Sequence, residues 1–209
     1  EVSEKEIFFM PTWRNWIKLE DAKIEYTEYF KNIMELVTNE KLNKFLEENN
    51  IKFNIYIHQL MQDYLKSFSK IKLGKNVQLL PKESEITKEL QKSKILITDY
   101  SSVAYDFFYL NKPILFFQFD KDEYQEKVGS YVDLDKELFG KAVYNVDECV
   151  QGIIDLTNNN FKYEKNLYEK IEKLRPKFLK YSDKANCDRV YDLILKKLGE
   201  RNEKENNKR

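Results

Sequence analysis

The chain has 209 residues, and its 36 basic side chains are balanced by 36 acidic ones, so the formal net charge is zero. This length is enough to bury a hydrophobic core and excludes a small scaffold held together by disulfides. A neutral chain also argues against a protein that coats nucleic acid through its overall charge, so any anion-binding site must be local.

The cysteines and the short apolar runs narrow the class of protein further. Cys149 and Cys187 are far apart and lack the paired Cys/His spacing of a zinc site, so we expect no metal centre and a reducing compartment. No apolar run is long enough for a membrane span, and the first residues do not form a signal peptide. Because the chain begins with Glu1 rather than Met, we expect a piece of a longer polypeptide.

Six short runs rich in β-branched and aromatic residues are typical of strands. They lie at 7–10, 53–57, 77–80, 95–98, 113–119 and 142–144. Apolar residues with helical spacing lie between them, over 26–48, 60–68, 84–92 and 102–110. Strands that alternate with helices predict an α/β fold, a Rossmann-like parallel sheet with helices on both faces.

The last part of the chain is helical in pattern, with C-terminal helices near 147–156, 163–175 and 183–198 that we expect to pack on the sheet. Residues 199–209 carry no apolar side chain and are expected to form a disordered tail after a single domain over 1–198. The stretch 162–184 has 8 basic and 4 acidic side chains. It is either a solvated helix face or a contact surface for a phosphate polymer or lipid headgroups.

Polar residues follow several predicted strands, at the edge of a parallel sheet where ligands bind. The most informative segment begins as the buried strand 95–98 and continues through Asp99 to Ser101, Ser102 and a helix. Two adjacent serines at the start of a helix act either as helix caps or as phosphate ligands.

Three further candidates lie in the segments after other strands. His58, the only histidine, follows the second predicted strand and is either a structural residue or a group for phosphate binding and proton transfer. Arg14 follows the first strand and suits either a diphosphate or a carboxylate. Asp120 and Glu123 follow the fifth strand, where carboxylates accept ribose hydroxyls, order a basic partner or solubilise a loop.

Several common site motifs are absent from the sequence. It lacks the GxGxxG and GxxxxGK[ST] loops and the GxSxG elbow. These absences disfavour a dinucleotide-dependent dehydrogenase, a P-loop nucleotidase and a serine hydrolase. Phosphate binding by hydroxyls, backbone N–H groups and one or two cations is the chemistry that remains.

Residues 97–120, ITDYSSVAYDFFYLNKPILFFQFD, resemble the signature of the CDP-glycerol glycerophosphotransferase family, which includes teichoic-acid and capsule polymerases. Three shorter motifs also resemble the family and occur along the chain in the family's order: FMPTWR at 9–14, DKDEY at 120–124 and DRV at 188–190. The resemblance implies that this chain is the C-terminal, donor-binding half of a GT-B enzyme with two Rossmann-like domains.

The resemblance also implies an activity. Such an enzyme transfers glycerol phosphate from CDP-glycerol, or ribitol phosphate from CDP-ribitol, to a teichoic-acid-like or capsular polymer, releases CMP and uses no cofactor or metal. By resemblance His58 is the catalytic residue, and Arg14, Ser101 and Ser102 bind the donor phosphates. The family commonly has His-Pro where this chain has His58-Gln59. Further candidate contacts to the nucleotide or alditol are Thr98, Asp99, Asp106, Asp120 and Glu123.

The implied mechanism is attack of an acceptor hydroxyl on the phosphorus bonded to glycerol. His58, Arg14 and the N–H groups at Ser101 and Ser102 would stabilise the charge on the departing CMP. The implied partners are the nucleotide donor, an anionic polymer or lipid-linked acceptor, and an N-terminal domain of the same enzyme that supplies the base; nucleic acid is not among them. A lipid-linked acceptor implies a cytoplasmic enzyme at the inner face of the membrane, with 162–184 as the peripheral contact.

Two other functions stay open from the residues alone. One is a GT-B glycosyltransferase that uses another nucleotide sugar. The other is a non-catalytic nucleotide-binding module that docks to a partner through its basic helices.

Overall fold

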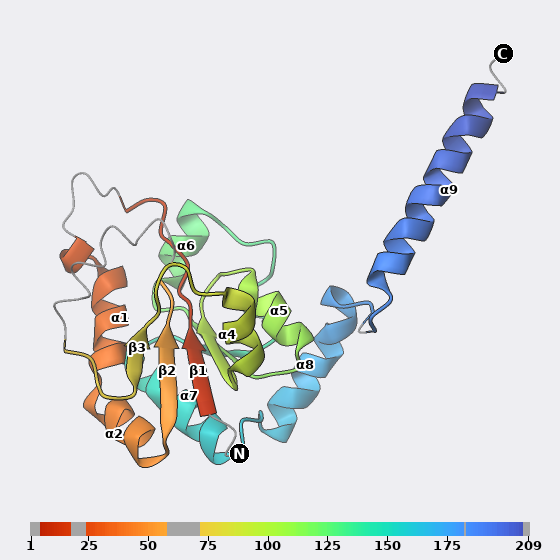
Figure 1. The fold of residues 1–209 in the computed structure, drawn as a ribbon. Coiled ribbons are helices and arrows are strands. Elements are labelled where there is room, and N and C mark those ends of the chain that lie inside the picture. The colour runs from red at the N-terminus through yellow and green to blue at the C-terminus, as the bar shows by residue number, and fades with distance from the viewer. Residues whose placement is uncertain (1–4, 18–23, 58–71, 182, 207–209) are drawn as a thin grey trace. The chain divides into compact units, whose positions relative to one another are not determined.

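The computed structural model describes residues 5–17, 24–57, 72–181 and 183–206 (Figure 1). The chain divides into two compact units, Glu1–Leu174 and Arg175–Arg209. The first unit contains the sheet and the candidate site. The expected boundaries, a domain over 1–198 and a tail over 199–209, stay a prediction.

Six parallel strands form one sheet in the order β3-β2-β1-β4-β5-β6. The strands are β1 (Lys5–Phe9), β2 (Ile51–Ile55), β3 (Val77–Leu79), β4 (Ile95–Thr98), β5 (Ile114–Phe117) and β6 (Lys141–Val143). The predicted parallel sheet is confirmed. The chain adds β2 and β3 on one side of β1 and then β4, β5 and β6 on its other side. The carboxyl ends of β1 and β4 therefore border a topological switch point, where ligands bind in such folds.

Helices cover both faces of the sheet, as the sequence predicted. The helical elements described are η1 (Ile24–Tyr26), α1 (Glu28–Thr38), α2 (Glu40–Glu48), α4 (Ile86–Lys92), α5 (Val103–Tyr109), α6 (Lys121–Lys127), α7 (Val146–Asn158), α8 (Lys165–Phe178) and α9 (Asn186–Asn206). On one face α2 and α7 pack against the sheet, with α1 packed against both helices; α4 and α5 pack on the other face (Figure 1).

Two helix predictions differ from the structure, and a third cannot be compared. The single helix expected over 26–48 is two helices, because Asn39 ends α1 and its side chain caps α2 by accepting from the Leu42 N–H at 3.0 Å. The helix expected near 183–198 is α9, which continues to Asn206. The helix expected over 60–68 lies outside the described residues.

The central strands are buried on both faces, which explains their unbroken apolar sequence. All residues of β4 and β5 are buried. Ile97, Leu115 and Phe117 belong to the core cluster shared with α1, α2 and α7. Burying such side chains contributes about 1.5–3 kcal/mol each, so the strand ends that carry the candidate site rest on a well-packed base.

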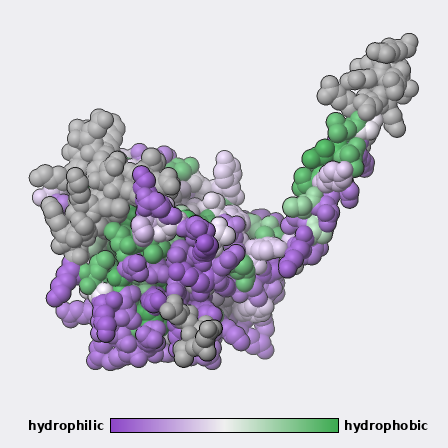
Figure 2. Space-filling model, in the orientation of Figure 1, coloured by the Kyte–Doolittle hydropathy of each residue, from purple (hydrophilic) through white to green (hydrophobic). Residues whose placement is uncertain are grey.

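The second unit has a different surface. Exposed apolar side chains gather along α9 (Figure 2), namely Val190, Leu193, Ile194, Leu195 and Leu198. Among the helices described, none is both long enough and apolar enough to cross a bilayer.

Gly140, directly before β6, tests the packing between β6 and its neighbour β5. A Cβ on Gly140 would stand 2.7 Å from the Ile114 carbonyl oxygen and 2.7 Å from the nearest Phe116 ring carbon. We therefore expect Gly140→Ala to lower the free energy of unfolding by about 1–3 kcal/mol in urea titrations. Gly199→Ala is the matched control, because a Cβ there meets nothing within 4 Å. Equal unfolding midpoints for the two variants would contradict the close approach.

Candidate functional site

The carboxyl ends of β1, β4 and β5 bring three polar segments together. They are residues 10–14 after β1, 99–102 after β4 and 118–121 after β5. These segments contain Arg14, Asp99, Ser101, Ser102 and Asp120, so the structure brings together five of the predicted site residues. The chain achieves this because neighbouring parallel strands end at the same edge of the sheet.

Arg14 lies at the centre of the cluster and is 0% exposed. Its Nη1 is 2.8 Å from Asp99 Oδ2 and donates to the Thr12 carbonyl oxygen at 2.7 Å. Its Nε and Nη2 donate to the two carboxylate oxygens of Asp120 at 2.6 and 3.0 Å. Five aromatic rings surround the guanidinium, with centroids 5.0–5.9 Å from Cζ: Trp16, Tyr29, Tyr100, Phe119 and Tyr124.

Of the two partners that the sequence left open for Arg14, the structure pairs it with carboxylates, and its predicted role as a phosphate ligand stays a prediction. Burial opposes the charged guanidinium, but Asp99 and Asp120 outweigh it and hold the pKa of Arg14 above its usual value. Removing one partner of a buried ion pair costs about 3–5 kcal/mol, so the carboxylates retain the guanidinium strongly. In this arrangement Arg14 is a buried ion-pair residue, without an exposed surface for a phosphate.

Asp99 and Thr98 join the end of β4 to the segment after β1. Asp99 Oδ1 accepts from the backbone N–H of Thr12 at 2.9 Å and of Tyr100 at 2.6 Å. Thr98 Oγ1 donates to the Met10 carbonyl oxygen at 2.7 Å. Both side chains are buried and have internal partners, and their predicted contacts to the nucleotide or alditol stay a prediction.

The two serines differ in whether they cap α5, which the sequence left open. Ser101 Oγ accepts from the Val103 N–H at 3.4 Å, which makes it a weak cap of α5. Ser102 is exposed and makes no side-chain cap hydrogen bond, although it occupies the N-cap position. Its hydroxyl therefore does not cap α5.

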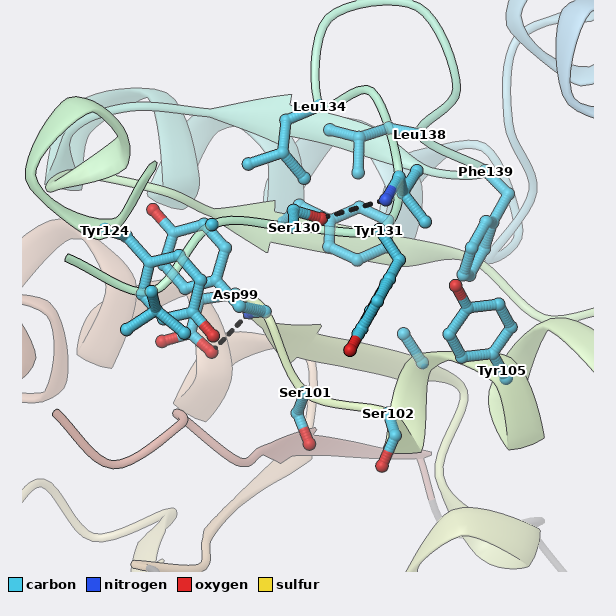
Figure 3. A pocket seen from close by; sticks show the side chains of 16 residues that line it. Asp99, Ser101, Ser102, Tyr105, Tyr124, Ser130, Tyr131, Leu134, Leu138 and Phe139 are labelled. Carbon is cyan, nitrogen blue, oxygen red and sulfur yellow. Dashed lines mark hydrogen bonds between the residues drawn. The ribbon is translucent and has the colours of Figure 1, made fainter. Parts of the chain in front are cut away.

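A pocket of about 650 Å³ lies beside the two serines (Figure 3). Asp99 is the charged residue among its described lining, and it is paired with Arg14. Tyr131 projects into the pocket from the loop after α6 and is fully exposed. The rest of the lining is aromatic, aliphatic or hydroxyl-bearing: Tyr100, Ser101, Ser102, Ala104, Tyr105, Phe116, Tyr124, Val128, Gly129, Ser130, Val132, Leu134, Leu138 and Phe139.

Two further predicted residues lie apart from this cluster, and one lies outside the described residues. Asp106 is exposed on α5, and Glu123 is exposed on α6, where its carboxylate is 3.6 Å from Lys127 Nζ. Asp120 is committed to Arg14 and also accepts from the Tyr100 hydroxyl at 3.2 Å. His58 lies outside the described residues, so its predicted role stays a prediction.

Sequence reasoning missed the aromatic part of the site. Tyr100 and Tyr124 stack with ring centroids 3.6 Å apart and connect the Arg14 cluster to the pocket. The available signal was the recurrence of tyrosine after β4 and β5. Within the described ranges, no three His, Cys, Asp or Glu side chains converge as metal ligands.

Three tyrosines of this cluster predict a loss of stability in alkali. Burial, followed by the neighbouring Asp99 and Asp120, raises the pKa of Tyr29 and Tyr100, and burial also raises the pKa of Tyr124. The unfolded chain therefore releases these protons first, near pH ~10. Their contribution to stability is full below that pH and is lost as the pH rises above it. The urea concentration at the unfolding midpoint should fall as the pH is raised from about 9 to about 11, and it should fall less in Tyr29→Phe. A midpoint that does not change over this pH range would contradict the prediction.

Comparison with known sequences gives a family match over most of the chain. The family described as CDP-Glycerol:Poly(glycerophosphate) glycerophosphotransferase matches residues 2–196. The chain is 33% identical over 202 residues to the minor teichoic acid biosynthesis protein GgaB of Bacillus subtilis strain 168, covering 92% of this chain and 21% of GgaB. It is 29% identical to the teichoic acid glycerol-phosphate primase of the same strain, covering 91% of this chain and 43% of the primase. The chain thus spans less than half the length of these curated relatives.

Solved structures share the fold. The wall teichoic acid polymerase TagF aligns with a TM-score of 0.63 at 22% identity, over 96% of this chain and 45% of TagF. A TagF variant soaked with CDPG aligns with a TM-score of 0.61 at 21% identity, over 96% of this chain and 43% of that one. At these identities the likeness supports the Rossmann-like fold alone.

Proposed function

Because the chain belongs to the CDP-glycerol:poly(glycerophosphate) glycerophosphotransferase family, we propose that it binds a CDP-activated alditol, CDP-glycerol first, for transfer of glycerol phosphate. The observation that carries this proposal is the pocket beside Ser101 and Ser102, at the carboxyl ends of β4 and β5. The TagF structure soaked with CDPG supports the same class of donor.

The groups that line the pocket suit two different parts of the donor. Rings, aliphatic side chains and hydroxyls line its wall, which suits an uncharged part of the donor. Ser102 and Ser101 lie at its side and offer hydroxyl and backbone donors for the phosphates. The donor phosphates are therefore assigned to the serines, and the uncharged part to the aromatic wall.

In the proposed reaction an acceptor hydroxyl attacks the phosphorus bonded to glycerol. The new O–P bond joins glycerol phosphate to the acceptor, and the bond to CMP breaks with its electron pair on the CMP oxygen. Donors fixed in advance at that oxygen stabilise the developing charge, each by a factor of about 10²–10³. We assign His58 to this step and the general base to a second domain of the intact enzyme.

The acceptor and the cellular location belong to the same proposal. The names of the relatives support a teichoic-acid-like polymer as the acceptor. A lipid-linked acceptor of this kind would place the intact protein at the inner face of the cell membrane, with the basic stretch 162–184 as its contact with anionic headgroups.

Calorimetry with CDP tests the donor site. We expect CDP to bind the wild-type chain, and Ser101→Ala and Ser102→Ala each to weaken binding about tenfold, because each variant loses a hydrogen bond to a charged group. Thr38→Ala, which removes an exposed hydroxyl at the end of α1, is the control and should bind as the wild type does. No heat from folded protein at millimolar CDP would defeat the assignment. Binding of UDP in preference to CDP would favour another nucleotide sugar, and binding of an anionic polymer without nucleotide would favour a non-catalytic module.

Tyr131 tests the aromatic wall without disturbing the fold. Because the side chain is fully exposed, Tyr131→Ala should leave the melting temperature unchanged. It should weaken CDP-glycerol binding by about 0.5–1.5 kcal/mol, while Tyr131→Phe retains most of the affinity. Tyr168→Ala removes another exposed ring, on α8, and serves as the control. Identical affinities for the Tyr131→Ala and Tyr168→Ala variants would exclude Tyr131 from the donor site.

A further inference from the structure

We propose that Arg14 is a positioning residue: by bridging Asp99 and Asp120 it fixes the turn that presents Ser101 and Ser102 to the donor. This inference rests on the proposed function, because it concerns the geometry of the same site. It assigns Arg14 a role without contact to the donor, in place of the phosphate contact predicted from the sequence.

Arg14 connects segments that the chain brings together only in the folded state. Its guanidinium reaches Asp99 after β4 and Asp120 after β5, the latter 106 positions away in the sequence. The segments after β1, β4 and β5 thus share one cation. Since each segment leaves the sheet as a loop, the shared cation supplies a fixed point that the strands alone do not supply.

The connection from Arg14 to the serines is short. Nη1 of Arg14 holds one oxygen of Asp99, and the other oxygen accepts from the Tyr100 N–H, one residue before Ser101. The Tyr100 hydroxyl donates to Asp120, so Tyr100 is held at its backbone and at its ring. Tyr100 also stacks on Tyr124, and both rings line the pocket. Loss of the guanidinium would release the turn at both attachments.

The geometry requires an arginine rather than any cation. Nε and Nη2 meet the two oxygens of Asp120, while Nη1 points to Asp99 and Thr12. A lysine ammonium is a point charge on a flexible stem and cannot reproduce this planar pattern. Arg14→Lys therefore retains the charge and removes the positioning.

The chain offers a matched control at the amino end of the sheet. Lys92 Nζ lies 3.2 Å from a carboxylate oxygen of the buried Glu6 and 3.1 Å from one of the buried Glu89. Like Arg14, it is a cation shared by two carboxylates. It is the last residue of α4, ahead of β4 and away from Ser101 and Ser102. Lys92→Met removes a cation paired with two carboxylates, although a half-exposed one, without touching the turn.

The experiment compares Arg14→Lys, Arg14→Met and Lys92→Met in the full chain, below the melting temperature of each variant. CDP affinity is measured by calorimetry, and backbone amide exchange is measured at Thr12 and Tyr100. We expect both Arg14 variants to bind CDP at least about tenfold more weakly and to exchange these two amides at least about tenfold faster. Lys92→Met should leave both quantities within about twofold of the wild type, even where its melting temperature falls.

The outcomes separate positioning from a purely structural role. Folded Arg14→Lys that binds CDP like the wild type, or exchanges the two amides at the wild-type rate, would overturn the proposal. If Arg14→Met does not fold, Arg14→Lys and Asp120→Asn carry the same two readouts. If the wild-type chain does not bind CDP, the proposed function fails, and the exchange rates at Thr12 and Tyr100 still decide whether Arg14 fixes the turn.

Discussion

A guanidinium buried between two carboxylates is the interaction on which the candidate site depends. Arg14 is removed from water, so its charge is tolerable only while Asp99 and Asp120 both face it. The five surrounding rings exclude water and attract the cation through their faces. Because loss of one partner leaves an unpaired buried charge, the segments after β1, β4 and β5 adopt their positions together.

This arrangement separates the charged interior from the surface that meets a ligand. The carboxylates of Asp99 and Asp120 are engaged by Arg14, and the pocket beside them presents hydroxyls and rings. The helix after the serines, α5, has seven residues, so its dipole adds little to anion binding. In the proposed function the donor is recognised mainly by hydrogen bonds and ring contacts, which give directional specificity to a chain with no net charge.

Local pattern predicted the sheet, and long-range side-chain pairing determined the site. The strand 95–98 was predicted because a strand covered on both faces is apolar throughout, and the meeting of residues after β1, β4 and β5 followed from parallel topology. The partners of Arg14 were not predictable, because the sequence offered both phosphate and carboxylate as ligands and Asp120 is 106 positions away. Tyr131 was missed because it lies in a loop that has no periodic pattern, and His58 lies outside the described residues.

A crystal structure of the chain with bound CDP tests the central claim most directly. The account predicts phosphate density against Ser101 and Ser102, with the Arg14 guanidinium still paired with Asp99 and Asp120. Phosphate density on Arg14, with Asp120 released from it, would contradict the account.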